Sequence, residues 1–361
     1  MFRIRLSESA MPTGSKDPDV LLAWLLDSMG LVRRKSEGMS IDDEQGALHR
    51  LIRETLLSEP LKGWDTKSLG DVSGLSQTGM HHQLVKLRES GLVAAETEGR
   101  WHIHVLRGGS ISAAVDLVSV QARAILDLRL SEVAEMVTES DDRMVIPSEE
   151  RGGGFQIEIA EPGATIEGED RLDALMRDLG LNGERGKHND RLARQLFEQI
   201  SSSRRAMTLL ALADKTGDSR SRVQRAVERM RAAGIAERVP MLDRIAQDVY
   251  AGLMRQHDAR GEEWLMTRGG LGRLDESVSK SLIAGVRKKS LNIEKVQDIL
   301  APVPLDAQRV LLNTLGGRMP YGIRISGRDG AAVKERVMRQ TDRTLRRLRT
   351  VAQRLDESLA S

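Results

Sequence analysis

The chain contains no cysteine, and this absence excludes several kinds of site. Without thiols there is no disulfide, no cysteine-based zinc finger and no thiol nucleophile. Aromatic residues account for only 2% of the sequence. Proteins that bind single-stranded nucleic acid stack bases on repeated aromatic side chains, so the composition argues against that class.

Long apolar segments and a strong net charge are also missing. No apolar run approaches the ~18 residues that a membrane span requires. The polar residues that follow Leu6 do not fit a secretory signal, and we expect no contact with a membrane. The formal net charge is +2, so any binding of nucleic acid depends on local basic patches.

Apolar residues are abundant enough to build packed cores. They make up 40% of the 361 residues, and this length predicts two or three domains. Asp17 and Pro18 are typical of a helix start, and an apolar face follows them, so we expect a helix over 18–31. A polar stretch at 33–44 links this helix to the next segment.

Residues 45–108 carry the clearest pattern in the chain. An apolar helical stripe ends before residue 60, and a short helix is expected over 66–72. Gly74 supplies a turn, and Ser76 caps a longer helix, whose apolar positions are Met80, Leu84 and Leu87. Two short strands are then expected around a turn at 98–99, because apolar residues alternate at 101, 103 and 105. This order of helices and hairpin predicts a winged helix-turn-helix.

The segment GLSQTGMHHQLVKLRESGLV, residues 74–93, resembles the block around the third helix of ArsR- and Lrp-type regulators. The resemblance covers about sixty residues and rests on the Gly-Leu-Ser entry, the apolar spacing and the Gly-Leu-Val exit. The sequence departs from that family at Gly79, where a better helix former is usual, and at His81-His82. The resemblance implies a DNA-binding transcription regulator of prokaryotic type.

The segment TGDSRSRVQRAVERMRAAGIA, residues 216–236, repeats this spacing. Ser219 corresponds to Ser76, 143 positions earlier. The other corresponding pairs are Gly74 with Gly217, Met80 with Val223, Leu84 with Val227, Leu87 with Met230, and Gly91 with Gly234. A helical stretch follows Val239-Pro240 directly, so we expect a second helix-turn-helix whose wing is reduced or replaced.

The remaining segments are expected to be mostly helical. A long helical stripe covers 111–137, apolar residues at 155, 157 and 159 alternate as a strand, and residues 321–325 predict another short strand. The last helix, over 331–359, has the 3-4 spacing of a coiled-coil seam, which either pairs two chains or packs on its own chain. The seam positions are Met338, Thr341, Leu345, Leu348, Ala352, Leu355 and Leu359.

The predicted fold is mainly α with small β-wings, built from tandem winged helix-turn-helix units and a helical C-terminal region. The predicted divisions are an N-terminal helix and linker (1–44), a first winged helix-turn-helix (45–108), a bridging helix and strand (109–186), a second helix-turn-helix (187–260) and a helical region with a coiled-coil end (261–361).

In a helix-turn-helix the third helix faces the major groove of DNA, so its polar residues are the candidate contacts. In the first unit these residues are Gln77, Thr78, His81, His82 and Lys86. Glutamine pairs with adenine edges, threonine contacts phosphate or a thymine methyl, and lysine neutralises phosphate. A wing-tip arginine is expected to reach the minor groove or a nearby phosphate, and that residue is Arg100.

Arginines dominate the corresponding helix of the second unit. Arg222, Arg225 and Arg229 share a face, since residues three and four apart lie together on a helix, and Arg220 precedes them. We expect this helix to bind phosphate while the first unit selects the base sequence. A merely solvated basic face is the alternative.

Signals for other chemistry are weak. His102 and His104 share a strand face, but no cysteine or clear acidic partner completes a zinc ligand set with them. The stretch RGGLG at 268–272 lacks the Lys-Ser/Thr of a phosphate-binding loop. We expect no catalytic site, metal or cofactor, and we expect Trp64 and Trp101 to pack in the core or against the wing.

The sequence thus predicts a cytoplasmic, nucleoid-associated protein that binds double-stranded DNA as a homodimer and regulates transcription. Two alternatives stay open. An architectural protein would bind duplexes with little sequence preference. A scaffold would use its winged helices to bind proteins and would show no salt-dependent DNA binding.

Overall fold

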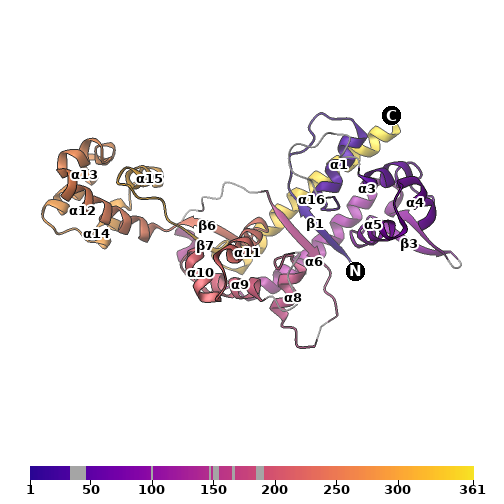
Figure 1. The fold of residues 1–361 in the computed structure, drawn as a ribbon, viewed down its shortest axis with the longest axis horizontal. Coiled ribbons are helices and arrows are strands. Elements are labelled where there is room, and N and C mark those ends of the chain that lie inside the picture. Colours follow the sequence, from indigo (N-terminus) through magenta and orange to yellow (C-terminus); the bar gives the residue numbers. More distant parts are fainter. Residues whose placement is uncertain (33–45, 99–100, 146–147, 149–153, 165–166, 184–190) are drawn as a thin grey trace.

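The computed structural model describes all residues except 33–45, 99–100, 146–147, 149–153, 165–166 and 184–190 (Figure 1). The expected linker at 33–44, the wing-tip residue Arg100 and most of the Gly-rich turn before Phe155 lie outside the described residues. The described chain is mainly helical with small antiparallel sheets, as predicted. Within the described ranges, no helix is both long and apolar enough to cross a membrane.

Residues 47–106 form three helical segments and a three-stranded sheet, called here the first unit. The helical segments are α3 (Ala47–Leu51) with the π-helical turn η1 (Ile52–Leu56), α4 (Thr66–Ser73) and α5 (Gln77–Glu89). The strands β2 (Trp64–Asp65), β3 (Val93–Glu98) and β4 (Trp101–Leu106) hydrogen-bond in the order β2-β4-β3.

The helix starts of the first unit follow from side-chain caps. The Asp65 carboxylate accepts hydrogen bonds from the backbone N of Lys67 at 2.9 Å and of Ser68 at 3.0 Å, which begins α4. A further hydrogen bond from the Ser68 hydroxyl is the largest cause that lowers the pKa of Asp65. Ser76 Oγ accepts from the backbone N of Gly79 at 3.3 Å and begins α5. These caps satisfy backbone N–H groups that the helix itself leaves without partners.

Residues 192–240 and 321–325 repeat this arrangement and are called the second unit. Its helices are α9 (Leu192–Ser202), α10 (Leu209–Thr216) and α11 (Arg220–Ala232). Strand β6 (Ala236–Pro240) pairs with β7 (Tyr321–Ile325), and Met207 bridges to Ile323 on the other side of β7. The partner strand of β6 therefore follows the segment 241–320 in the sequence. Strand β7 falls in the predicted C-terminal region 261–361 but hydrogen-bonds to β6, which lies in the predicted division 187–260.

Residues 241–320 form a helical insertion at one end of the molecule (Figure 1). Its helices are α12 (Leu242–Thr267), α13 (Glu276–Arg287), α14 (Ile293–Leu300) and α15 (Leu305–Thr314). Buried apolar residues such as Val249, Leu282 and Leu312 form a core separate from that of the two units. The RGGLG turn lies here, and close packing explains its glycine: φ at Gly270 is +88°, and a Cβ there would lie 2.5 Å from Thr314 Oγ1.

Two long helices, α6 (Ile111–Glu135) and α16 (Gly330–Ala360), pair antiparallel along the middle of the molecule (Figure 1). Asp356 accepts hydrogen bonds from the backbone N of Ile111 and Ser112, at 3.3 and 3.0 Å, near one end of the pair. Lys334 Nζ donates to Ser131 Oγ at 2.8 Å near the other end. The seam of the last helix packs on its own chain, where the buried positions are Met338, Thr341, Leu345, Leu348, Ala352 and Leu355.

Besides the α6–α16 pair, two short strands connect the N-terminal part of the chain with the part that follows α6. Strand β1 (Arg3–Ser7) pairs antiparallel with β5 (Gln156–Ala160). Helix α1 (Pro18–Ser28) follows β1, and helix α8 (Arg171–Asp178) follows β5, with the short helix α7 (Asp142–Val145) before it. The turns after α1 and α8 match: Gly30 and Gly180 have φ of +66° and +69°, and a Cβ on either would press on the neighbouring strand, β1 or β5.

The repeat therefore extends over nearly the whole chain. In chain order, β1, α1, α3 to α5, β3, β4 and α6 correspond to β5, α8, α9 to α11, β6, β7 and α16. The register corresponds as well, since Trp64 pairs with His104 as Met207 pairs with Ile323. Trp64 and Met207 are 143 positions apart, whereas His104 and Ile323 are 219 positions apart, so the segment from β6 to β7 contains 76 residues more than the segment from β3 to β4.

Candidate nucleic-acid interface

The outward face of α5 is polar and carries little charge. The opposite face of α5 is buried through Met80, Leu84 and Leu87, so the polar face is exposed to solvent. The exposed residues of its first turns are Gln77, Thr78, His81 and His82, and Lys86 is half-buried. The residues of α5 that the sequence assigns to DNA thus lie together, and Arg100 is outside the described residues.

Gly79 lies close to the cap that begins α5. Its backbone N donates to Ser76 Oγ, and a Cβ on Gly79 would lie 3.3 Å from that oxygen and 3.5 Å from Leu75. A larger residue would therefore press on the cap that begins α5.

Helix α11 presents arginines at the corresponding positions. Arg220, Arg222 and Arg225 are exposed, and Arg222 forms an ion pair with Asp218 at 2.7 Å. Arg220 stands where the first unit has Gln77, and Arg225 stands at the position of the second of the paired histidines. The same capped frame therefore carries two different surfaces.

Arg229 does not extend this exposed row. It is half-buried, and its Nε donates to the carbonyl oxygen of Leu181 at 2.8 Å. Its Nη2 lies 3.4 Å from the carbonyl oxygen of Asn182. The residues that follow α8 thus cover the end of the predicted arginine face, so the prediction that Arg229 belongs to the exposed face is wrong.

Strand β4 contains one exposed and one buried histidine. His102 is exposed, whereas His104 is 3% exposed and has Nε2 at 3.5 Å from Thr66 Oγ1. Burial lowers the pKa of His104, and the charges of Arg88 and His102 act in the same direction. Among the described residues, no group of three or more histidine, aspartate or glutamate side chains is placed to hold a metal ion.

The two predicted core tryptophans have different outcomes. Trp64 is 9% exposed and belongs to the main core, and Lys62 Nζ lies 4.1 Å from the centre of its ring. The prediction for Trp64 is confirmed. The side chain of Trp101 lies outside the described residues.

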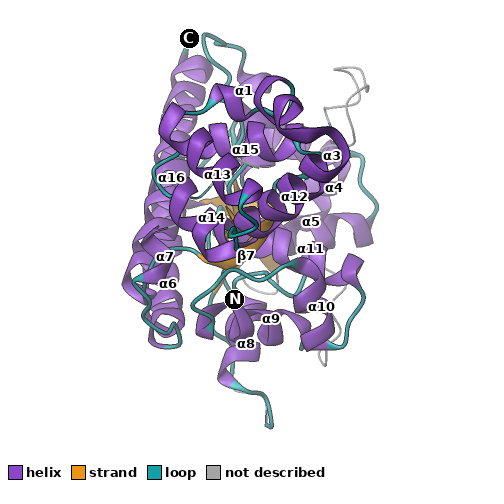
Figure 2. Cartoon of the chain, turned by 90° about the vertical axis from the view of Figure 1, so that its left-hand side faces the viewer, coloured by secondary structure: helices purple, strands orange, loops and turns teal. Residues whose placement is uncertain are grey.

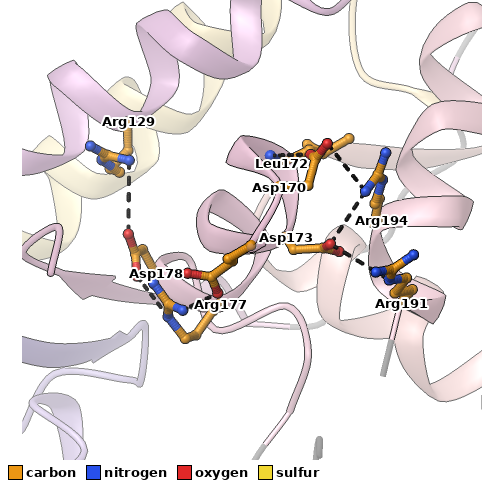
Figure 3. Close-up of polar contacts among 9 residues, drawn as sticks. Arg129, Asp170, Leu172, Asp173, Arg177, Asp178, Arg191 and Arg194 are labelled. Atoms are coloured by element: carbon orange, nitrogen blue, oxygen red, sulfur yellow. Dashed lines mark hydrogen bonds and ion pairs between the residues drawn. The ribbon is translucent and has the colours of Figure 1, made fainter. Parts of the chain in front are cut away.

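An ion-pair network joins α6, α8 and α9 (Figure 3). Arg129 Nη1 on α6 lies 3.8 Å from Asp178 Oδ2, and Arg177 Nε lies 3.3 Å from Asp178 Oδ1. Burial raises the pKa of Asp178, and the two arginines oppose this effect. On the other side of α8, Arg194 lies 3.3 Å from both Asp170 and Asp173. These contacts hold the second unit against the long helices.

The arginines of α16 are largely engaged within the chain. Arg343 and Arg347 both lie 2.6 Å from Glu8, and Arg349 lies 2.9 Å from Asp116. Arg354 donates to backbone carbonyl oxygens between β1 and α1. These arginines of α16 therefore stabilise the packing of this helix against the rest of the chain.

Both third helices lie on one side of the molecule. Viewed along its long axis, α4, α5, α10 and α11 lie on one side and the α6–α16 pair on the other (Figure 2). The repeat is consistent with this placement, because the last strand of each unit leads into a long helix, β4 into α6 and β7 into α16. Helices α5 and α11 thus lie on the same side of the α6–α16 pair (Figure 2).

Comparison with known proteins finds no match: no family model fits the chain, and neither a curated protein nor a solved structure is detectably similar to it.

Proposed function

We propose that the protein binds duplex DNA through α5 and α11, as third helices of two winged helix-turn-helix units in one chain, and regulates transcription. The observation that carries the proposal is the repeated unit itself. Each copy exposes the polar N-terminal half of a capped third helix beside an antiparallel strand pair. In a winged helix-turn-helix, this half of the third helix enters the major groove.

The two helices suit different tasks. The amide of Gln77 and the hydroxyl of Thr78 are groups that contact base edges or phosphate. The guanidinium groups of Arg220, Arg222 and Arg225 suit phosphate, because they carry charge and several donors. We therefore assign base selection to the first unit and phosphate anchoring to the second.

The salt dependence of DNA binding tests the phosphate contacts. Removal of one arginine–phosphate interaction should reduce the slope of log K against log salt by ~0.9. The variant Arg220→Ala/Arg225→Ala should thus lower the slope by about 1.8. The control Arg339→Ala/Arg346→Ala removes two exposed charges from α16 and should leave the slope unchanged. Equal slopes for all three proteins would contradict the assignment.

Selection of bound genomic fragments at physiological salt tests the regulatory role. An enriched motif that Gln77→Ala weakens, with an unchanged salt slope, is the expected result. Flat enrichment would favour an architectural protein. Recovery of no fragment would favour a scaffold that binds proteins.

A further inference from the structure

The two units are attached to opposite ends of the α6–α16 pair. Strand β4 leads through residues 107–110 into α6 at Ile111, and β7 leads through residues 326–329 into α16 at Gly330. Because the helices are antiparallel, Gly330 lies beside Ala134, near the far end of α6. The contact is so close that the Ala134 carbonyl leaves no space for a Cβ on Gly330.

The length of α6 sets the separation of these attachments. From Ile111 to Ala134 the helix advances about 35 Å, at 1.5 Å per residue. Half-sites one helical turn apart on DNA are ≈34–36 Å from centre to centre. The attachment points thus match the period of the duplex, and both third helices lie on the same side of the helix pair (Figure 2).

The separation is fixed by contacts along the whole pair. Arg123 Nε lies 2.9 Å from Asp342 Oδ1, and Lys334 Nζ lies 2.9 Å from Asp127 Oδ1. The facing apolar residues of both helices are buried in the main core. The β1–β5 ladder joins the halves again. A flexible linker would permit many spacings, whereas this frame favours one.

The two units are not identical, so their half-sites need not be identical. Operator palindromes mirror the exact two-fold symmetry of a homodimer. Here Arg220 replaces Gln77 at the corresponding position, and Arg225 replaces His82. A palindrome would therefore present the same bases to two surfaces of different chemistry.

We infer that one chain occupies a bipartite, asymmetric site on duplex DNA, whose two half-sites lie one helical turn apart. The inference rests on the proposed function and replaces the homodimer by a covalent pair of units. The half-site under α5 carries the base sequence, and the half-site under α11 is held through its phosphates. Binding of one unit places the other at high effective concentration over its half-site, which strengthens the whole complex.

The test uses the full-length protein and the duplex recovered by genomic selection. Mass photometry should give one chain per duplex. Insertion of five base pairs between the half-sites turns one of them by about half a helical turn, and we expect binding to weaken at least tenfold. The same insertion placed outside the site is the control and should have no effect.

The outcomes separate this inference from the proposed function. Two chains per duplex, or an internal insertion without effect, would overturn the bipartite site and leave DNA binding intact. Recovery of no duplex would overturn both. The variant Arg220→Ala/Arg225→Ala should lose most of its sensitivity to the internal insertion, since its second unit no longer anchors the complex.

Discussion

Glu237 joins the second unit to α16, and its removal should strongly destabilise the protein. Its carboxylate is 3% exposed and accepts hydrogen bonds from Arg324 Nε at 2.7 Å and Arg336 Nη1 at 2.6 Å. In Glu237→Ala, the buried guanidinium of Arg324 loses this countercharge. Loss of one partner from a buried ion pair costs ~3–5 kcal/mol. We expect the free energy of unfolding to fall by that amount in urea denaturation followed by far-UV circular dichroism.

The first unit supplies a compensating variant. The residues that correspond to Glu237 and Arg324 are Ala94 and Val105. Replacement of a buried ion pair by apolar residues of similar volume is often neutral. Ala and Val are smaller than Glu and Arg and leave a cavity, so Glu237→Ala/Arg324→Val should recover part of the lost stability. The control Glu335→Ala breaks an exposed ion pair with Arg339 on α16 and should lower the free energy of unfolding by no more than ~1 kcal/mol. If the double variant were as unstable as the single variant, both the charge argument and the correspondence of the units would be refuted.

Three further predictions concern the folded frame. Burial lowers the pKa of His104, so the histidine is protonated near pH 6.5 in the unfolded chain and only at lower pH in the folded chain. The free energy of unfolding should therefore fall from pH 7.5 to about 5.5. The variant His104→Ile should lack this part of the pH dependence. Gly74→Ala and Gly217→Ala should each lower the free energy of unfolding by about 1 kcal/mol in denaturant melts, because φ is +68° and +67° at these positions. The two losses should be similar, since no atom lies within 4 Å of either added Cβ. Leu348→Ala should cost about 2–5 kcal/mol; a loss that depended on protein concentration would show that the seam also joins two chains.

Helices α5 and α11 could be predicted because their signals are local. Ser76 and Ser219 cap the helices that follow them, and the glycines at 74 and 217 take a positive φ at the preceding turns. The apolar spacing then fixes which side of each third helix is exposed. The orientation of the polar face of α5 was therefore predictable from the sequence alone.

The pairing of β6 with β7 could not be predicted, because strand pairing is non-local. The apolar pattern at 321–325 indicates a strand, but nothing nearby shows that its partner ends at Pro240. The last helix posed the same problem: its seam is clear in the sequence, whereas the surface that covers it depends on α6 and α1.

Buried arginines were also invisible in the sequence. Arg143 lies in a polar stretch, yet it is fully buried and donates to the carbonyl oxygens of Thr138, Ser201, Ser203 and Arg328. Burial lowers the pKa of its guanidinium. Arg229 lies in a regular row of arginines in the sequence, but Leu181 and Asn182 cover it in the structure. The exposure of such residues depends on the packing of distant elements, which local spacing does not report.

Hydroxyl-radical footprinting of the selected DNA tests most directly whether one chain places both third helices on one duplex. We predict two protected backbone patches on the same face of the duplex, about 10 base pairs apart, and the disappearance of only one patch with Arg220→Ala/Arg225→Ala. A single patch with the wild-type chain, or the disappearance of both patches together in the variant, would contradict the account.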